Sequence, residues 1–275
     1  MAEGVSLHLG VNRVDAGHYG GFAAGQPTRW EGNLRGCEHD ATDLQTVARD
    51  QGFTASALLG EAATVDAVST GVTEAAASLK AGDLFVVTFS GYGGQVPDGN
   101  SEEHWYEHTW ALYDRQLPED ELASLLTSFL SNVRVLVLDD SSSSGTVRRD
   151  VSSVEALFGE PPTRALPAGI AMDTYRSNSA VYDGIQSAHV SGDRAAIQAG
   201  VIVITGFGEN QLAGEGPRNG VFTDALLRVW DDGRFQGDYE RFIQKVAALM
   251  PPTQIPQLTV RGSGAPFLSE RPLTI

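Results

Sequence analysis

The amino-acid sequence predicts an α/β fold with a mostly parallel central β-sheet and helices on both of its faces. Short apolar runs, typical of buried strands, alternate with segments in which apolar residues recur at helical spacing. Such strand, helix, strand repeats favour parallel pairing, because a helix covers each crossover. Polar, glycine-bearing segments follow three of the strands, which is where ligands bind in parallel sheets.

The elements follow in chain order. The predicted strands are short and apolar: residues 5–11, 54–59, 84–89, 133–138 and 201–205. The predicted helices have one apolar face each: residues 40–51, 65–79, 119–130, 221–230 and 239–249. Between residues 146 and 193 the pattern fades. Pro161, Pro162 and Pro167 argue against regular structure there, so we expect a long surface connection.

Composition limits the function classes. A chain of 275 residues is long enough to bury one large core, so one domain is expected. No apolar stretch is long enough to span a bilayer, and a cytoplasmic location is expected. The net charge of −16 disfavours nucleic acid and membrane surfaces as partners and favours basic peptides. Cys37 is the single cysteine, which excludes a disulfide framework.

Three polar segments should converge on one site at the carboxyl edge of the sheet: "FSGYGGQ" (89–95), "DDSSSSG" (139–145) and "TGFGENQ" (205–211). A dinucleotide site is disfavoured because Gln211 stands where its third glycine belongs. A hydrolase elbow is disfavoured because Ser141 stands where Ser143 would need a preceding glycine. On spacing alone, the four serines are typical of a solvated turn.

Together with "GCEHDA" (36–41), these segments resemble the caspase-like peptidases, most closely the metacaspases, whose bacterial members are also called orthocaspases. The family's motifs read GCxNDA, YSGHGGQ and DSCHSG. The later segments "VITGFGENQLAGE", "GVFTDALL" and "TQIPQL" also resemble the family, so the likeness covers nearly the whole chain. It implies a caspase-hemoglobinase fold in one domain, 1–275. Within it, 1–147 is large-subunit-like, 148–195 an intersubunit connection and 196–275 small-subunit-like.

The departures from the family fall on its chemistry. Tyr92 stands at the catalytic histidine position, Ser142 at the catalytic cysteine position, and Ser143 replaces the histidine that follows. A serine hydroxyl is far less acidic than a thiol, and tyrosine, with a pKa of about 10, is a poor base at neutral pH. The resemblance therefore predicts a pseudo-peptidase. The alternative is an active Arg/Lys-specific endopeptidase that uses Ser142, with His39 as the base.

The resemblance also assigns a pocket for arginine or lysine side chains to Cys37, Asp40, Ser90 and Asp140. Two carboxylates that face one cavity repel each other unless a cation lies between them. From the residues alone, Asp40 also fits a helix N-terminal acid and Asp140 a strand-end cap.

The family is cleaved after basic residues of its connection, where this chain has three arginines: Arg148, Arg149 and Arg164. If the centre is inactive, the chain should stay intact. An alternative use is that one of these arginines fills the pocket as a built-in plug.

We expect no cofactor. Calcium is an open alternative, because many metacaspases hold it with carboxylates near the catalytic loop. The acidic loop 98–114 lacks the family's adjacent acidic pair, and Arg149 stands where a further ligand is expected, with Asp150 as its substitute. The loop's acids are Asp98, Glu102, Glu103, Glu107 and Asp114.

The function that we expect is binding or regulation. The partners would be basic peptide or protein segments, or an active caspase-like relative. A further alternative is a structural interaction module without peptide binding, for which the aromatic residues Trp105, Tyr106 and Trp110 would be exposed.

Overall fold

The computed structural model describes residues 2–23, 26–27, 29–99, 106–142, 163–188, 196–208 and 211–275. Within these ranges, six strands form a central sheet in the order β11-β10-β9-β5-β1-β4. The strands of this sheet are β1 (Gly4–Gly10), β4 (Thr54–Leu59), β5 (Leu84–Ser90), β9 (Arg134–Asp140), β10 (Gly200–Thr205) and β11 (Gln257–Gly262). Neighbouring strands are parallel, except that β11 runs antiparallel to β10. The predicted α/β class is confirmed.

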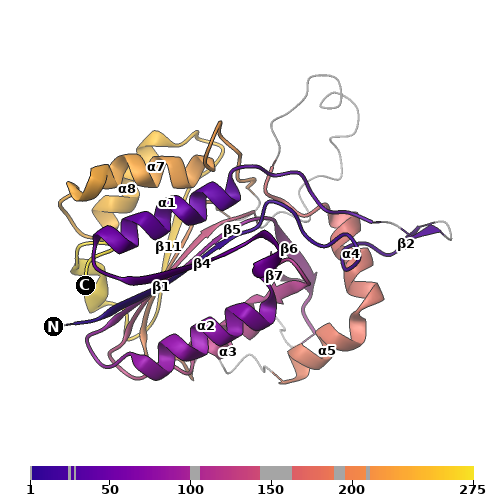
Figure 1. Ribbon diagram of the computed structural model, residues 1–275, viewed down its shortest axis with the longest axis horizontal. Coiled ribbons are helices and arrows are strands. Elements are labelled where there is room, and N and C mark those ends of the chain that lie inside the picture. Colours follow the sequence, from indigo (N-terminus) through magenta and orange to yellow (C-terminus); the bar gives the residue numbers. More distant parts are fainter. Residues whose placement is uncertain are drawn as a thin grey trace.

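Helices cover both faces of the sheet (Figure 1). One face carries α1 (Cys37–Asp50), α7 (Val221–Trp230) and α8 (Tyr239–Leu249). The other carries α2 (Val65–Ser78) and α3 (Glu119–Leu126). The two carboxy-terminal helices begin and end where the sequence predicts, whereas α3 ends earlier than predicted.

The strands separate two apolar clusters, because successive side chains of a strand point to opposite faces. In β9, Leu136 and Leu138 belong to the cluster beneath α1, α7 and α8. Val135 and Val137 belong to the cluster that contains α2 and α3. The two aspartates that end this strand therefore also face opposite sides of the sheet.

Smaller sheets lie outside the central one. One contains β6 (Gly93–Pro97), β7 (Tyr106–Ala111) and β8 (Gln116–Pro118), and a two-stranded ribbon contains β2 (Phe22–Ala23) and β3 (Gln26–Pro27). The prediction of an acidic loop is wrong over β7. Trp110 of this strand is buried and stacks on Phe89, with 4.8 Å between ring centroids.

The expectation of an irregular connection is also wrong within its described part. Two helices occur there, α4 (Ala168–Ser177) and α5 (Ser179–Ala188). Helix α4 begins directly after Pro167, where a missing N–H is tolerated because the first turn of a helix leaves its N–H groups unpaired. Tyr182 of α5 is buried and anchors the pair to the domain.

The remaining described helical turns are short 3-10 segments: Gly60–Ala62, Asp231–Gly233 and Pro266–Ser269. None of the helices in the described ranges has both the length and the hydrophobicity required of a membrane span.

Candidate functional site

The carboxyl ends of β5 and β9 stand side by side, with Ser90 opposite Asp140 in the strand register. Asp40 lies in the first turn of α1, near the end of the neighbouring strand β1. Asp40 and Ser90 are hydrogen-bonded to each other, with 2.6 Å between the serine Oγ and the carboxylate Oδ2. The structure thus brings together Asp40, Ser90 and Asp140, and the fourth residue that the family resemblance assigns to a pocket, Cys37, begins α1 beside them.

The guanidinium of Arg164 occupies the space between the two aspartates. Its Nη2 lies 2.7 Å from Asp40 Oδ2, and its Nη1 lies 3.0 Å from Asp140 Oδ2. Glu215 adds a third carboxylate, with Oε1 3.3 Å from Nη2. The exposed fraction of the Arg164 side chain is 0%. Such burial of a charge is costly unless it is paired, and here three carboxylates share one cation.

Polar groups of the surrounding chain complete the Arg164 pocket. Arg164 Nη1 donates to Ser90 Oγ at 2.7 Å and to the backbone oxygen of Asp140 at 3.0 Å. The hydroxyl of Thr223 donates to Asp140 Oδ2 at 2.6 Å, and its N–H donates to the same atom at 3.1 Å. Thr223 lies in the first turn of α7, so the positive end of this helix faces the carboxylate.

The walls of the Arg164 pocket are close to the guanidinium. A Cβ atom at Gly220 would lie 2.4 Å from Asp140 Oδ2 and 2.5 Å from Arg164 Cζ. The N–H of Gly220 donates to Asp40 Oδ1 at 3.0 Å. Any larger residue at this position would push the guanidinium out, so glycine is required by close approach.

Burial and charge act against each other in this pocket. Burial raises the pKa of Asp140, and the charge of Arg164 opposes that rise only in part. Burial lowers the pKa of Arg164, but the neighbouring groups together, above all the carboxylates of Asp140 and Asp40, outweigh it and hold this pKa well above its ordinary value. Burial raises the pKa of Cys37, whose Sγ lies 3.9 Å from Glu215 Oε1. Cys37 is therefore a neutral wall residue.

The backbone around Arg164 is held as an added strand. Its N–H donates to the oxygen of Ala213 at 3.0 Å, and its own oxygen accepts from the N–H of Gly93 at 2.8 Å. Leu166 N–H donates to Gly93 O at 2.8 Å, and Thr163 forms an antiparallel bridge with Gly214. Residues 163–166, called here the Arg164 segment, thus lie between β6 and residues 213–214. This is the geometry by which sheets capture extended peptides.

Ser142 lies beside the Arg164 segment. It is fully buried, and its Oγ accepts a hydrogen bond of 2.7 Å from the N–H of Ala213, the residue whose oxygen holds Arg164. A Cβ atom at Gly93 would lie 2.0 Å from the backbone oxygen of Ser142, so these two backbones are in close contact.

The side chain of Tyr92 contacts Asn33 and Trp30. Its hydroxyl oxygen accepts from the N–H of Asn33 at 2.8 Å, and its ring packs edge-on against Trp30 with 4.6 Å between centroids. Burial raises the pKa of Tyr92 to about 12. A phenol with this pKa stays protonated at neutral pH and cannot take a proton from Ser142.

The histidines of the described ranges share no hydrogen bond with Ser142. His39 is exposed on α1. His8 is buried and contacts Ser6 and Thr88. The other two described histidines are His18 and His108. His104, His189 and Ser143 lie outside the described residues. The described arrangement holds a cation and an extended chain, but it gives Ser142 no proton acceptor.

Sequence reasoning missed Glu215, Gly220 and Thr223. All three follow β10, and nothing in their spacing distinguishes them from an ordinary loop and helix start. The only signal is that all three lie in segments that resemble the family: Glu215 ends "VITGFGENQLAGE", and Gly220 and Thr223 lie in "GVFTDALL". Arg148 and Arg149, the other candidate arginines, lie outside the described residues.

The described acids of the 98–114 segment have structural partners. Asp120 N–H donates a short hydrogen bond to Glu107, and Val65 N–H donates to Asp114 Oδ1 at 3.0 Å. Glu102, Glu103 and Asp150 lie outside the described residues, so the calcium alternative stays open.

The expected surface aromatics are only partly exposed. Tyr106 is 42% exposed, but Trp110 is only 4% exposed, and the prediction of an exposed side chain is wrong for it. Trp105 lies outside the described residues.

Comparisons with known proteins agree with this architecture. The Caspase domain family model matches residues 18–267. The crystal structure of protein GSU0716 from Geobacter sulfurreducens is 40% identical, with a TM-score of 0.86 and 99% of each chain covered. Caspase-1 from Spodoptera frugiperda shares the fold, with 10% identity and a TM-score of 0.50 over 94% of this chain and 86% of that one. No curated protein matches the chain. The predicted caspase-like fold is confirmed.

Proposed function

The chain belongs to the caspase domain family, and from this premise we propose that it is a metacaspase-like member without peptidase activity that recognises arginine-bearing, extended segments. In its resting state the recognition site holds the chain's own Arg164 segment. The observation that carries this proposal is the fully buried guanidinium of Arg164, which is shared by three carboxylates while its backbone is paired on both sides.

The chemistry of the pocket supports selectivity for arginine. Asp40 and Asp140 approach different nitrogens of one planar group, and Ser90 supplies a further acceptor. A guanidinium has its donors in a fixed fork that matches such a set, whereas an ammonium is a compact point charge that cannot reach all of these acceptors at once.

The residues beside the pocket support binding rather than cleavage. Ser142 is held as an acceptor by Ala213, and Tyr92 is a phenol with a raised pKa. Without a base, a serine hydroxyl is a weak nucleophile, and loss of either group in a related mechanism costs about 10⁶-fold in rate.

An outside ligand must compete with the Arg164 segment. The apparent affinity for such a ligand is reduced by the small fraction of molecules in which this segment is detached. A partner that pulls on the segment, for example a caspase-like relative with its own arginine-bearing connection, would open the site. Binding of an outside arginine would then be coupled to displacement of the Arg164 segment.

The test uses a labelled peptide with the sequence of residues 163–166, Thr-Arg-Ala-Leu, and the same peptide with citrulline in place of arginine. Citrulline keeps the shape of arginine but is neutral. We expect Arg164→Ala to bind the arginine peptide at least about tenfold more tightly than the wild type, and the citrulline peptide to bind neither. Arg176→Ala is the matched control, because Arg176 is 70% exposed and pairs only with Asp173 in the described surface.

Equal binding of the arginine and citrulline peptides would show that the pocket does not recognise the positive charge of arginine. Absence of binding to Arg164→Ala, in a variant whose circular dichroism shows a folded chain, would leave Arg164 as an internal ion pair without a recognition role. That result would favour the structural interaction module.

A second candidate function is an active endopeptidase, and one observation favours it: the Arg164 segment places an arginyl peptide bond beside Ser142. The test is intact-mass measurement after long incubation, with and without calcium, together with fluorogenic arginyl and lysyl peptides. Cleavage that disappears in Ser142→Ala would establish this function and overturn the inactive one.

A further inference from the structure

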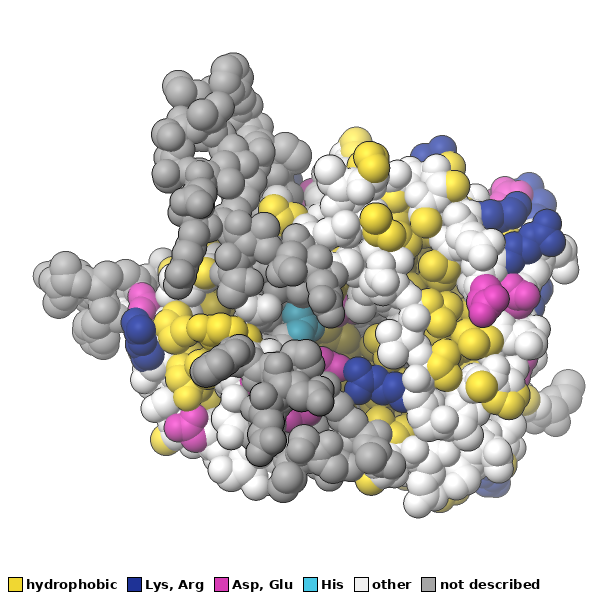
Figure 2. Space-filling view, turned by 180° about the vertical axis from the view of Figure 1, so that it is seen from behind, with side chains coloured by type: hydrophobic (Ala, Val, Ile, Leu, Met, Phe, Trp, Pro, Cys, Tyr) yellow, Lys and Arg dark blue, Asp and Glu magenta, His cyan; other side chains and the backbone are white. Residues whose placement is uncertain are grey.

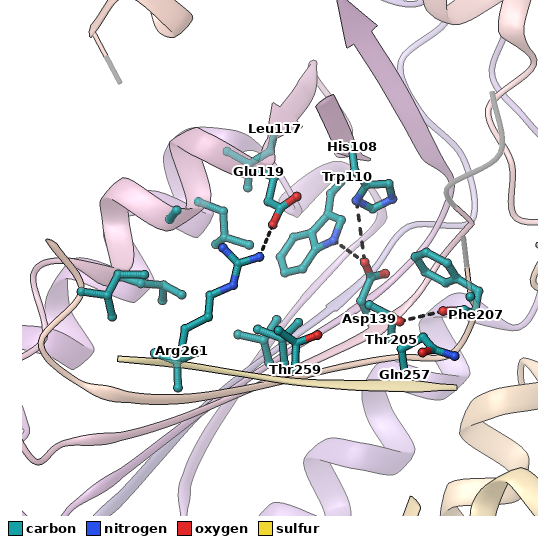
Figure 3. A pocket seen from close by; sticks show the side chains of 18 of the residues that line it. His108, Trp110, Leu117, Glu119, Asp139, Thr205, Phe207, Gln257, Thr259 and Arg261 are labelled. Atoms are coloured by element: carbon teal, nitrogen blue, oxygen red, sulfur yellow. Dashed lines mark hydrogen bonds and ion pairs between the residues drawn. The ribbon is translucent and has the colours of Figure 1, made fainter. Parts of the chain in front are cut away.

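A second cavity lies on the opposite face of the sheet from the Arg164 pocket. Its volume is about 680 Å³. Its floor is formed by β9, β10 and β11, and one wall is formed by α3 (Figure 3).

The body of this cavity is apolar. Val137, Val201 and Val203 line it from the sheet, and Leu122 and Leu126 line it from α3. A volume in the range of about 300–1,000 Å³ with mostly apolar walls is typical of small-molecule sites. From the side opposite to Figure 1, the surface shows a hollow in which histidine, acidic and basic side chains lie beside hydrophobic ones (Figure 2).

One end of the cavity carries a buried acid. The side chain of Asp139 is 5% exposed. Its Oδ2 accepts from the indole N–H of Trp110 at 2.9 Å and lies 4.0 Å from His108 Nδ1. Its Oδ1 has no hydrogen bond of ordinary geometry within the described part of the chain, although the hydroxyl and N–H of Ser141 lie close enough to the carboxylate to lower its pKa. Nε2 of His108 also has no hydrogen bond within these residues.

Within the described residues, no arginine or lysine forms an ion pair with Asp139. Burial raises the pKa of Asp139, and His108 together with hydrogen bonds from Ser141 and Trp110 opposes this rise only in part. The other cation of the cavity, Arg261, lies toward a different side and is paired with Glu119 at 2.7 Å (Figure 3). A carboxylate removed from water in this way favours a cation that can enter the cavity.

We propose that this cavity is a binding site for a small organic cation, with an apolar body and a single ammonium or amidinium group. The head group pairs with the carboxylate of Asp139, and the body lies against the valines of β10 and the leucines of α3. The aromatic side chains of Trp110 and Phe207 stand at the same end, where their ring faces favour a positive charge.

This site is separate from the Arg164 pocket. Asp139 and Asp140 are consecutive in β9 and point to opposite faces of the sheet. The inference therefore does not depend on the proposed function, and either can fail alone.

The test uses three probes of one shape: 4-phenylbutylamine, 4-phenylbutanol and 4-phenylbutyrate. Calorimetry and ligand-observed NMR should detect binding of the amine, with the alcohol weaker by about tenfold or more and the acid not bound. Asp139→Asn should weaken amine binding to the level of the alcohol. Arg176→Ala should leave amine binding unchanged, because this exposed residue does not line the cavity.

A second variant tests the cavity without changing Asp139. Val203→Trp fills the floor of the cavity and should abolish binding of both amine and alcohol while the circular dichroism stays that of the wild type. Equal affinity for amine and alcohol, unchanged amine binding by folded Asp139→Asn, or no amine binding to the wild type would each overturn the proposal.

Discussion

Replacing Arg164 by alanine should destabilise the folded protein strongly. The change removes a cation that is 0% exposed and leaves the carboxylates of Asp40, Asp140 and Glu215 without it. Removing one partner of a buried ion pair costs about 3–5 kcal/mol, because an uncompensated buried charge remains. We expect a loss in this range near pH 7, against less than about 0.5 kcal/mol for the surface variant Arg176→Ala.

The loss should depend on pH in a defined direction. Burial already raises the pKa of Asp140 in the folded state above its ordinary value of about 4, and without the opposing charge of Arg164 this pKa rises further. A group with a raised folded-state pKa stabilises the folded chain below its unfolded pKa, and this stability is lost as the pH rises through the folded pKa. The difference between Arg164→Ala and the wild type should therefore shrink between about pH 7 and about pH 5.

The assay is urea unfolding followed by tryptophan fluorescence at both pH values. Ethylguanidine, which matches the atoms removed from the side chain, should recover part of the stability of Arg164→Ala, whereas ethylurea, its neutral counterpart, should not. A loss below about 1 kcal/mol near pH 7, or a loss that is equal at the two pH values, would refute the electrostatic account of the Arg164 pocket.

Three further changes test separate contacts. Thr223→Val removes the hydroxyl that donates to Asp140 and should cost about 1.5–3 kcal/mol in urea unfolding. Ser142→Ala should leave peptide binding intact and cost about 1–3 kcal/mol, because the buried Ala213 N–H loses its acceptor. Burial lowers the pKa of His8 to about 3, so the unfolded chain takes up a proton below pH 6.5 that the folded chain resists, and stability falls from about pH 6.5 to about pH 3. His8→Gln should flatten this fall in a pH series of unfolding curves.

Much of the fold follows from periodicity. The helices at Val221–Trp230 and Tyr239–Leu249 match their predicted ranges because each has one strongly apolar face and defined ends. The edge strand Gln257–Gly262 was missed, since an antiparallel edge strand with exposed residues lacks the continuous apolar run of a buried one. Helix α4 was missed because Pro167 was read as a breaker, although a proline directly before a helix is compatible with its start.

The site was less predictable than the fold. Asp40, Ser90 and Asp140 were named because they lie in motifs that resemble a family. Their partner Arg164 was one of three arginines with no local feature to separate them, and its position depends on pairing with Gly93 and Ala213, which are distant in sequence. Contacts of this kind are set by tertiary structure, which local sequence patterns do not encode.

The two aspartates at the end of β9 connect the two pockets of the molecule. Because the side-chain period of a strand is two, Asp140 enters the Arg164 pocket beneath α7, and Asp139 enters the cavity beside α3. Each buried acid is tolerated because its face of the sheet supplies hydrogen-bond donors: Arg164 and Thr223 for Asp140, and Trp110 for Asp139. A register shift of one residue would exchange the two acids and leave both without these donors. The pairing of Ser90 with Asp140 in the sheet therefore fixes both pockets at once, and the apolar residues that hold this register are part of each site.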